Sequence, residues 1–403
     1  MNASRKSMQH GIVKAMSESK DSEWDPFSPD AGPDQIERYD ELRHRCPVAH
    51  SQALGWSLFR HDDVMRALDD PGKFSNVVSV HKSVPNGMDP PEHTAYRRII
   101  DAFFEPERMR AIEPRLRSIA VTLIERMVAG NEIEVMSQVA DDFALQSQCA
   151  FLGWPADVHA PLRNWVRNNH AAIRSRDRSA ITAVATQFDS HIRAVLESRR
   201  SSGDAAADDV TSQLLRESVA GRPLTDDEIV SILRNWTVGE LGTIAASIGI
   251  LMHYLAQHPE LQEQLREHPA DLAAAIDEIL RIDAPLMTSR RRTSAPVTVR
   301  GQTLQVDERV SIMWGAANRD ENVFADADQF RLDRDPRLNL LYGAGIHVCP
   351  GAPLARLELR VFVEEVLSRV RLAPPAHHKP VRARYPAGGF ESLPMAIFKR
   401  DRT

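Results

Sequence analysis

The spacing of apolar positions predicts a chain that is mostly helical. From about Glu92 onward, apolar residues recur every three to four positions, which is the period of an amphipathic helix. Helices are predicted over 108–129, 137–152, 180–200, 226–257, 271–282 and 354–369. Strand-like runs are short and occur at 54–60, 296–312 and 370–398. We therefore expect a mainly α fold with small β-sheets (α+β).

Composition and charge narrow the class of protein. The 403 residues are 42% apolar and 26% charged, as in globular proteins, and the net charge of −6 comes from interspersed signs. No run of Lys and Arg suits a phosphate backbone, so nucleic acid is not an expected partner. The polar residues 1–24 are expected to be mobile, and no stretch resembles a signal peptide or a membrane span. A cytoplasmic protein without a membrane partner is the expectation.

Cysteine usage agrees with a reducing compartment. Cys46, Cys149 and Cys349 are an odd number and lie far apart, so they form neither a disulfide framework nor a zinc-binding pair. Cys349 differs from the other two because Gly343 and Gly345 allow tight turns before it and a helix begins just after it. A thiolate there is favoured by the helix N-terminus and by a metal. The alternative is a buried, inert cysteine.

The loop around Cys349 resembles the haem-binding signature of the cytochrome P-450 family, an aromatic residue followed by G-x-G-x-H-x-C-x-G. The matching residues are Tyr342, Gly343, Gly345, His347, Cys349 and Gly351. The resemblance implies haem b with the Cys349 thiolate as iron ligand, an arrangement general to this family. It also implies a triangular, helix-rich single haem domain over 25–403, with the haem between a long central helix and the helix after the cysteine loop. Tyr342, where Phe is usual, and Pro350 are departures.

A second motif lies on the predicted helix 271–282. Glu278 and Arg281 are three residues apart and share a helix face. Such pairs are common on surfaces, but this one resembles the E-x-x-R motif, which in the family is buried and structural. The family's third partner belongs to a P-x-R-F stretch. Here the matching positions are Gln329 and Phe330, so that role has no assigned residue.

Four cationic positions match those that bind the haem propionates in the family. They are His93, Arg97, Arg291 and His347. A dianionic cofactor edge inside a protein requires such donors. The alternative is solvated surface charge, above all for Arg291, which has arginine neighbours on both sides.

The helix 226–257 contains the expected oxygen-activating residues. Gly239 and Gly242 each disfavour a helix interior, and the close approach of a flat ligand is one reason to tolerate them. The family usually has an acid directly before a threonine, whereas this chain has Gly242 before Thr243. Glu240 lies three residues before Thr243, so we expect Thr243 to stabilise bound oxygen and Glu240 to supply protons through water. The alternative is that Glu240 is a solvated or salt-bridged residue.

The resemblance implies a monooxygenase that inserts one atom of O2 into a small hydrophobic substrate, with aromatic compounds included, by hydroxylation or oxidative dealkylation. Its pocket would include residues 75–88, 165–190, 236–243, 286–289 and 388–393. Electrons are expected from NAD(P)H through a ferredoxin- or flavodoxin-type reductase system, with the enzyme a monomer. The motif variants look most similar to the branch that includes reductase-fused members. A peroxide-driven peroxygenase and a non-catalytic haem sensor are the alternatives; the histidine spacing fits no zinc or non-haem iron motif.

Overall fold

The computed structural model describes residues 24–27, 34–79, 82–128, 132–175, 177–201 and 208–400. The segment predicted to be mobile, residues 1–24, lies outside the described residues except for Trp24. The chain divides into two compact units. The first comprises Met1–Val78, Arg281–Val348 and Arg384–Gly388, and the second comprises Ser79–Leu280, Cys349–Ala383 and Gly389–Thr403. A single haem domain over 25–403 stays a prediction.

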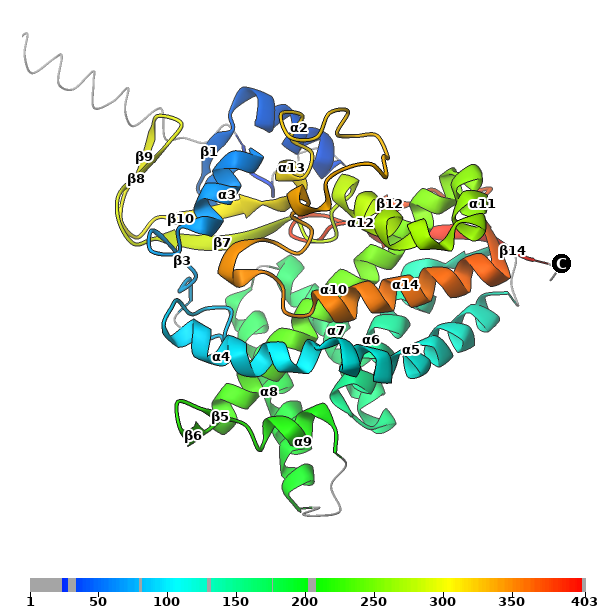
Figure 1. Ribbon diagram of the computed structural model, residues 1–403, viewed down its shortest axis with the longest axis horizontal. Helices are drawn as coiled ribbons and strands as arrows, with labels where there is room; N and C mark the ends of the chain where they lie inside the picture. The colour runs from blue at the N-terminus through cyan, green and yellow to red at the C-terminus, as the bar shows by residue number, and fades with distance from the viewer. Residues whose placement is uncertain are drawn as a thin grey trace, which may run out of the picture. The chain divides into compact units, whose positions relative to one another are not determined.

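The first unit is built on a five-stranded sheet with the order β1-β2-β10-β7-β3 (Figure 1). Its strands are β1 (Val48–Ser51), β2 (Gly55–Leu58), β10 (Arg309–Met313), β7 (Thr288–Thr293) and β3 (Phe74–Ser75). Strand β10 runs parallel to β2 and antiparallel to β7. The hairpin β8 (Val297–Val299) and β9 (Gln302–Leu304) and the helices α2 (Gln35–Arg45), α3 (His61–Asp69) and α13 (Trp314–Ala317) complete this unit. Leu58, Val64 and Ile312 are fully buried in its core.

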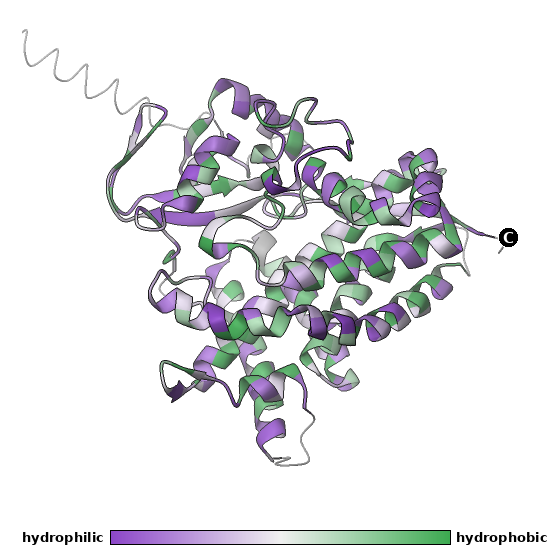
Figure 2. Ribbon diagram, viewed as in Figure 1, coloured by the Kyte–Doolittle hydropathy of each residue, from purple (hydrophilic) through white to green (hydrophobic). Residues whose placement is uncertain are grey.

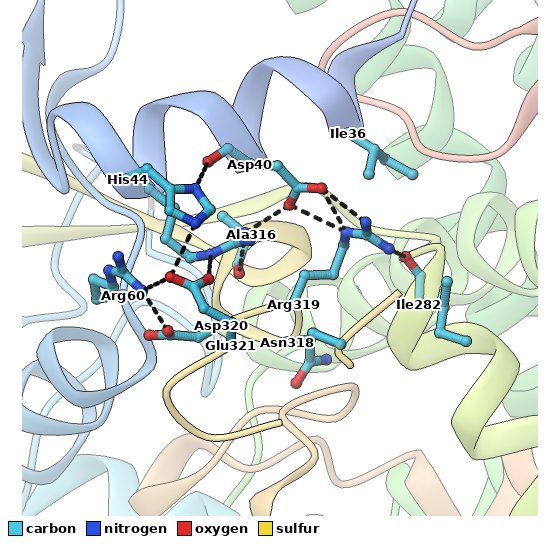
Figure 3. Close-up of polar contacts among 12 residues, drawn as sticks. Ile36, Asp40, His44, Arg60, Ile282, Ala316, Asn318, Arg319, Asp320 and Glu321 are labelled. Atoms are coloured by element: carbon cyan, nitrogen blue, oxygen red, sulfur yellow. Dashed lines mark hydrogen bonds and ion pairs between the residues drawn. The ribbon is translucent and has the colours of Figure 1, made fainter. Parts of the chain in front are cut away.

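Paired charges fasten α2 to the segment after α13 (Figure 3). Arg319 donates to Asp40 at 2.7 Å, and Arg43 donates to the same carboxylate at 2.6 Å. Arg60 pairs with Asp320 at 2.6 Å. Only 3% of Arg43 is exposed, so its charge requires these partners.

The second unit contains most of the helices. They are α4 (Glu92–Asp101), α5 (Pro106–Met127), α6 (Asp141–Leu152), α7 (His159–Ser175), α8 (Arg178–Ser201), α9 (Val210–Leu214), α10 (Asp226–Gln257), α11 (Pro259–Glu267), α12 (Leu272–Ile282, whose last two residues belong to the first unit) and α14 (Ala352–Arg369). Small sheets join β11 (Val370–Ala373), β14 (Pro394–Lys399) and β4 (Glu132–Glu134), then β12 (Val381–Arg382) and β13 (Phe390–Ser392), and β5 (Ser218–Val219) and β6 (Arg222–Pro223). Figure 2 shows hydrophobic and hydrophilic positions alternating along α14.

The long helix α10 is a core helix. It begins with a capping box in which Thr225 and Glu228 satisfy each other's backbone N–H groups. Within the described residues it is the one helix long and apolar enough to cross a membrane, yet 61% of its most apolar window is buried inside the protein. Its burial explains why its apolar residues lie on nearly every face rather than in one stripe.

The predicted mainly α fold with small sheets is confirmed. Each predicted helix is present, and the strand-like runs contain β2, β8 to β10 and β11 to β14. The sequence predictions missed the helices α2, α3, α7, α9, α11 and α13 and the strands β1 and β3 to β7.

Candidate functional site

Cys349 lies between a turn of 3-10 helix, η8 (Gly345–His347), and the start of α14. Gly343 and Gly345 have φ angles of +72° and +68°, in the left-handed region that favours glycine. A Cβ at Gly345 would lie 2.8 Å from the carbonyl oxygen of Leu68, so this loop also needs the small residue for its close approach to α3. Both expected tight turns are therefore present.

The sulfur of Cys349 has backbone donors but no simple electrostatic advantage. Desolvation raises the pKa of the thiol, while the N–H groups of Gly351 and Ala352 and the charge of Arg97 act in the opposite direction. The charge of Glu240 raises it further. A Cβ at Gly351 would lie 3.9 Å from the sulfur, in van der Waals contact. Without a metal this cysteine is expected to stay a thiol, so a bound cation is what would make it a thiolate.

Two glycines near the middle of helix α10, Gly239 and Gly242, leave part of the helix surface without side chains. A Cβ at either Gly239 or Gly242 would meet no atom within 4 Å, so there is open space beside the helix at both positions. Val238, next to them, is 45% exposed although it is apolar. A helix surface without side chains, with an exposed apolar neighbour, suits contact with a flat, largely apolar ligand.

Thr243 and Glu240 are close on α10, but their side chains have different partners. The Thr243 hydroxyl donates to the carbonyl of Gly239 at 2.7 Å, and the carbonyl of Glu240 lies at 3.4 Å. The carboxyl of Glu240 instead faces Gln148 of α6 and Glu358 of α14. Burial raises the pKa of Glu240. Glu240 is half-buried and faces no cation among the described residues, and its catalytic role stays a prediction.

The cationic positions divide between the units. His93 and Arg97 belong to α4 in the second unit, and Arg97 pairs with Asp101 at 2.9 Å. Burial and then the charge of Arg97 lower the pKa of His93, which is 3% exposed, so its imidazole is neutral near pH 7. Arg291 is on β7 in the first unit and is 6% exposed, which excludes the alternative of a solvated surface arginine.

His347 ends η8 in the first unit, and Tyr342 is half-buried just before the two turn glycines. The propionate-binding roles of His93, Arg97, Arg291 and His347 stay predictions.

Arg281 is a buried structural residue, as the family motif implies. It is 1% exposed and donates to the carbonyls of Asn318 at 2.7 Å and Ala327 at 2.8 Å. Its guanidinium also lies over the ring of Phe324, 4.8 Å from the centroid. Glu278, three residues earlier on α12, is 6% exposed and belongs to the second unit.

The sequence analysis missed three residues that contact the predicted site residues or their loops, Arg334, Gln148 and Glu358. Arg334 donates to the carbonyls of Ala325 and Asp326, both at 2.8 Å, and shares the ring of Phe324 with Arg281. It holds the loop for which no third residue was assigned. Gln148 and Glu358 were missed because nothing in the local sequence links α6 and α14 to Glu240. The only signal was an acid, Glu358, on an otherwise apolar helix face.

Comparisons with known proteins agree with this arrangement. The sequence profile of the family described as cytochrome P-450 matches residues 272–391. The chain is 30% identical to mycinamicin IV hydroxylase/epoxidase of Micromonospora griseorubida over 365 residues, which cover 86% of this chain and 90% of the relative. It is 29% identical to linalool 8-monooxygenase of Pseudomonas putida, covering 82% and 87% of the two chains.

Solved structures show the same fold. Cytochrome P-450 CYP109Q5 of Chondromyces apiculatus matches with a TM-score of 0.84 at 26% identity, over 94% of this chain and 99% of that one. CYP109E1 of Bacillus megaterium in complex with testosterone matches with a TM-score of 0.79 at 26% identity, over 90% and 99%.

These matches define the chain as a haem-dependent monooxygenase with the P-450 fold. The chain belongs to the cytochrome P-450 family, whose members bind haem b through a cysteine thiolate. The residues present fit that group, because a cysteine with backbone donors at its sulfur and a glycine-bared helix occur in the same compact unit. Similarity to the reductase-fused branch stays a prediction.

Proposed function

We propose that Cys349 is the iron ligand of haem b in this monooxygenase. The observation that carries the proposal lies within the second unit. There the thiol of Cys349 is close enough to Arg97 and Glu240 for both charges to act on it, so a sulfur, a cation and the oxygen-activating helix converge. Gly351 lies against the sulfur, and Gly343 and Tyr342 precede it in the loop.

The propionates would be held by His93, Arg97, Arg291 and His347. Arg97 and Arg291 supply positive charge, because guanidinium groups stay protonated and match carboxylates in geometry. The imidazole of His93 can donate a hydrogen bond to a propionate in either protonation state. Glu278 and Arg281 have a structural role and do not touch the haem.

The bound haem supplies the oxygen chemistry, and the chain supplies protons and orientation. The Thr243 hydroxyl donates to the Gly239 carbonyl, which leaves its oxygen lone pairs free to accept a hydrogen bond from water. Glu240, with its raised pKa, can take up a proton at a higher pH than an exposed glutamate and can pass it toward Thr243 through water.

The substrate is proposed to be small and hydrophobic, with aromatic compounds included. The exposed apolar side chain of Val238 on α10 supports this class, as does Leu286 in the first unit, which is 41% exposed. Linalool and testosterone are named for a relative and for a structural neighbour, and both names are consistent with hydrophobic ligands. Hydroxylation and oxidative dealkylation are the proposed reactions.

The proposed electron source is NAD(P)H through a ferredoxin- or flavodoxin-type reductase system, with O2 as oxidant and a cytoplasmic monomer as the working form. The acid near Thr243 can deliver the protons that the O2 reaction needs after reduction. Product formed with NAD(P)H and surrogate redox proteins would support this proposal. Product formed with peroxide alone would make the enzyme a peroxygenase.

Carbon monoxide spectroscopy tests the iron ligand. The reduced protein under carbon monoxide should give the absorbance band that is characteristic of a thiolate-bound haem. Cys349→Ser should lose this band, whereas Cys149→Ser, a change at a buried cysteine, should keep it. A band that persists in Cys349→Ser would overturn the assignment.

A further inference from the structure

The second unit contains two acidic side chains that face each other, the half-buried Glu240 and the fully buried Glu358. Glu240 projects from α10 and Glu358 from α14, and their carboxyl groups lie within hydrogen-bonding reach of each other. Glu358 is fully buried. When both acids are ionised, neither of its carboxyl oxygens accepts a hydrogen bond from any described residue. A hydrogen bond between the two carboxyl groups therefore requires a proton on one of them.

Two ionised carboxylates only accept hydrogen bonds, so they repel each other and cannot form the contact between Glu240 and Glu358. A proton on one of them turns the repulsion into a donor and an acceptor. Burial adds to the cost of a second negative charge, because neither group is solvated well enough to ionise freely. The pair therefore holds at least one proton.

Gln148 of α6 indicates which acid holds the proton. When its amide oxygen faces the hydroxyl of Thr237 at 3.3 Å, its nitrogen donates to both oxygens of Glu240 at 2.9 and 3.1 Å. Hydrogen bonds from an amide favour the ionised form of a carboxyl. Glu358 has no equivalent donor, so the proton belongs on Glu358 and the charge on Glu240.

No described cation competes for this charge. The titratable groups that interact electrostatically with Glu240 are Glu358 of α14, Cys149 of α6 and Cys349. All of them are acids, and each disfavours a second negative charge. Burial raises the pKa of both carboxyl groups, which agrees with a pair that keeps its proton at neutral pH.

We propose that Glu240 and Glu358 form a proton-sharing carboxyl pair in which Glu358 stores the proton and Gln148 keeps Glu240 ionised. Transfer breaks the O–H bond of Glu358 and forms one on Glu240, so the pair keeps a single negative charge and no electron moves. A proton from solvent returns to Glu358 as Glu240 gives up its own, so the pair ends as it began, with one proton and one negative charge. The delivery of this proton during catalysis rests on the proposed function, whereas the assignment of the proton to Glu358 is independent of it.

Infrared spectroscopy of the holoenzyme near neutral pH tests the pair. The wild type should show the carbonyl band of a buried protonated carboxyl, identified by its shift in D2O. Glu358→Gln should remove this band, because the amide replaces the protonated acid in shape and donor capacity. Glu240→Gln should keep the band at a shifted frequency, because Glu358 then faces an amide.

Gln148→Met supplies a test that does not change either acid. Loss of the amide removes the donor that keeps Glu240 ionised, so a second protonated-carboxyl band should grow at higher pH than in the wild type. The matched control is Glu365→Gln on the same helix. Glu365 is ion-paired with Arg117 at 2.6 Å and with Arg369, so its loss should leave the band unchanged.

Three outcomes would contradict the proposal of a proton-sharing carboxyl pair. The first is a wild type without the band, the second is a band of full intensity in Glu358→Gln, and the third is a Gln148→Met titration identical to that of the wild type. These readings require no turnover. If the carbon monoxide band were absent while the infrared pattern held, the proposed function would fail and the carboxyl pair would stand.

Discussion

Arg281 shows how main-chain carbonyl groups help to satisfy a buried charge. Its guanidinium donates to two main-chain carbonyls and lies over the ring of Phe324, which Arg334 also approaches at 5.9 Å. The loop from Asn318 to Arg334 thus folds around two arginines. The motif predicted the burial of Arg281 but not these acceptors, because carbonyl acceptors depend on backbone path and not on residue type.

Arg281→Ala should lower the free energy of unfolding by about 3 to 5 kcal/mol, because it leaves buried carbonyls without donors. Arg281→Lys should recover only part of the loss, since an ammonium group cannot match the fork of a guanidinium. Urea denaturation measures both. Arg337→Ala is the control, because Arg337 is 87% exposed, and it should leave the unfolding midpoint unchanged. Equal midpoints for Arg281→Ala and the wild type would contradict the structural role.

Gly345 is expected to be needed for two separable reasons, conformation and space. Gly301 has a similar left-handed φ of +81°, but a Cβ there meets nothing within 4 Å. Gly301→Ala should therefore cost only the left-handed penalty of about 1 to 2 kcal/mol. Gly345→Ala should cost more and should reduce the haem-to-protein ratio, because its Cβ would press on the Leu68 carbonyl. Denaturation and haem content measure the two effects, and equal costs at both positions would exclude the steric one.

At the scale of elements, the N-terminal part of α10 is fastened to chain far from it in sequence. The N–H of Val84 donates to the Ser231 hydroxyl at 2.9 Å, and the Asn235 amide donates to the Val84 carbonyl at 2.8 Å. Tyr96 of α4 and Arg222 of β6 both bond to Glu228. Val84 of the predicted pocket segment 75–88 is thereby held against α10, which supports a place beside the substrate for this part of the segment.

Glu228→Gln should lower stability by about 1 to 2 kcal/mol at neutral pH, since hydrogen bonds to a charged group are lost. The Arg222 hydrogen bond is the main cause that lowers the pKa of Glu228, ahead of the opposing effect of desolvation. A lowered pKa in the folded state means that the contribution is complete above the unfolded value of about 4.3 and is lost as pH falls below it. The difference between variant and wild type should narrow on acidification from pH 5 downward.

Unfolding curves at several pH values measure this effect of Glu228→Gln. Asp227→Asn is the matched control on the same turn, because Asp227 is 85% exposed and its ion pair with Arg193 lies at the surface. A constant difference between Glu228→Gln and the wild type across the acid range would contradict the linkage.

For the whole molecule, the sequence predicted the helices with a regular spacing of apolar residues and the residues that match a motif. It did not predict the contacts that depend on how distant helices pack. The spacing of apolar residues in α5, α10 and α14 follows from the burial of one or more helix faces, so it can be recognised in the sequence. Helix α7 and the short helix α11 were missed although each has an apolar face, because their charged and polar residues outweigh it in composition. The acid pair required knowing that α6, α10 and α14 meet.

Haem should stabilise the chain as a whole, because a ligand that binds only the folded state adds its binding free energy to folding. A free haem concentration 1,000 times the Kd would contribute about 4 kcal/mol. Extraction of the haem should therefore lower the melting temperature measured by calorimetry, and added haem should restore it. Cys349→Ser should recover less on haem addition than the wild type does, because it lacks the proposed iron ligand. An equal recovery would show that the sulfur contributes nothing to haem affinity.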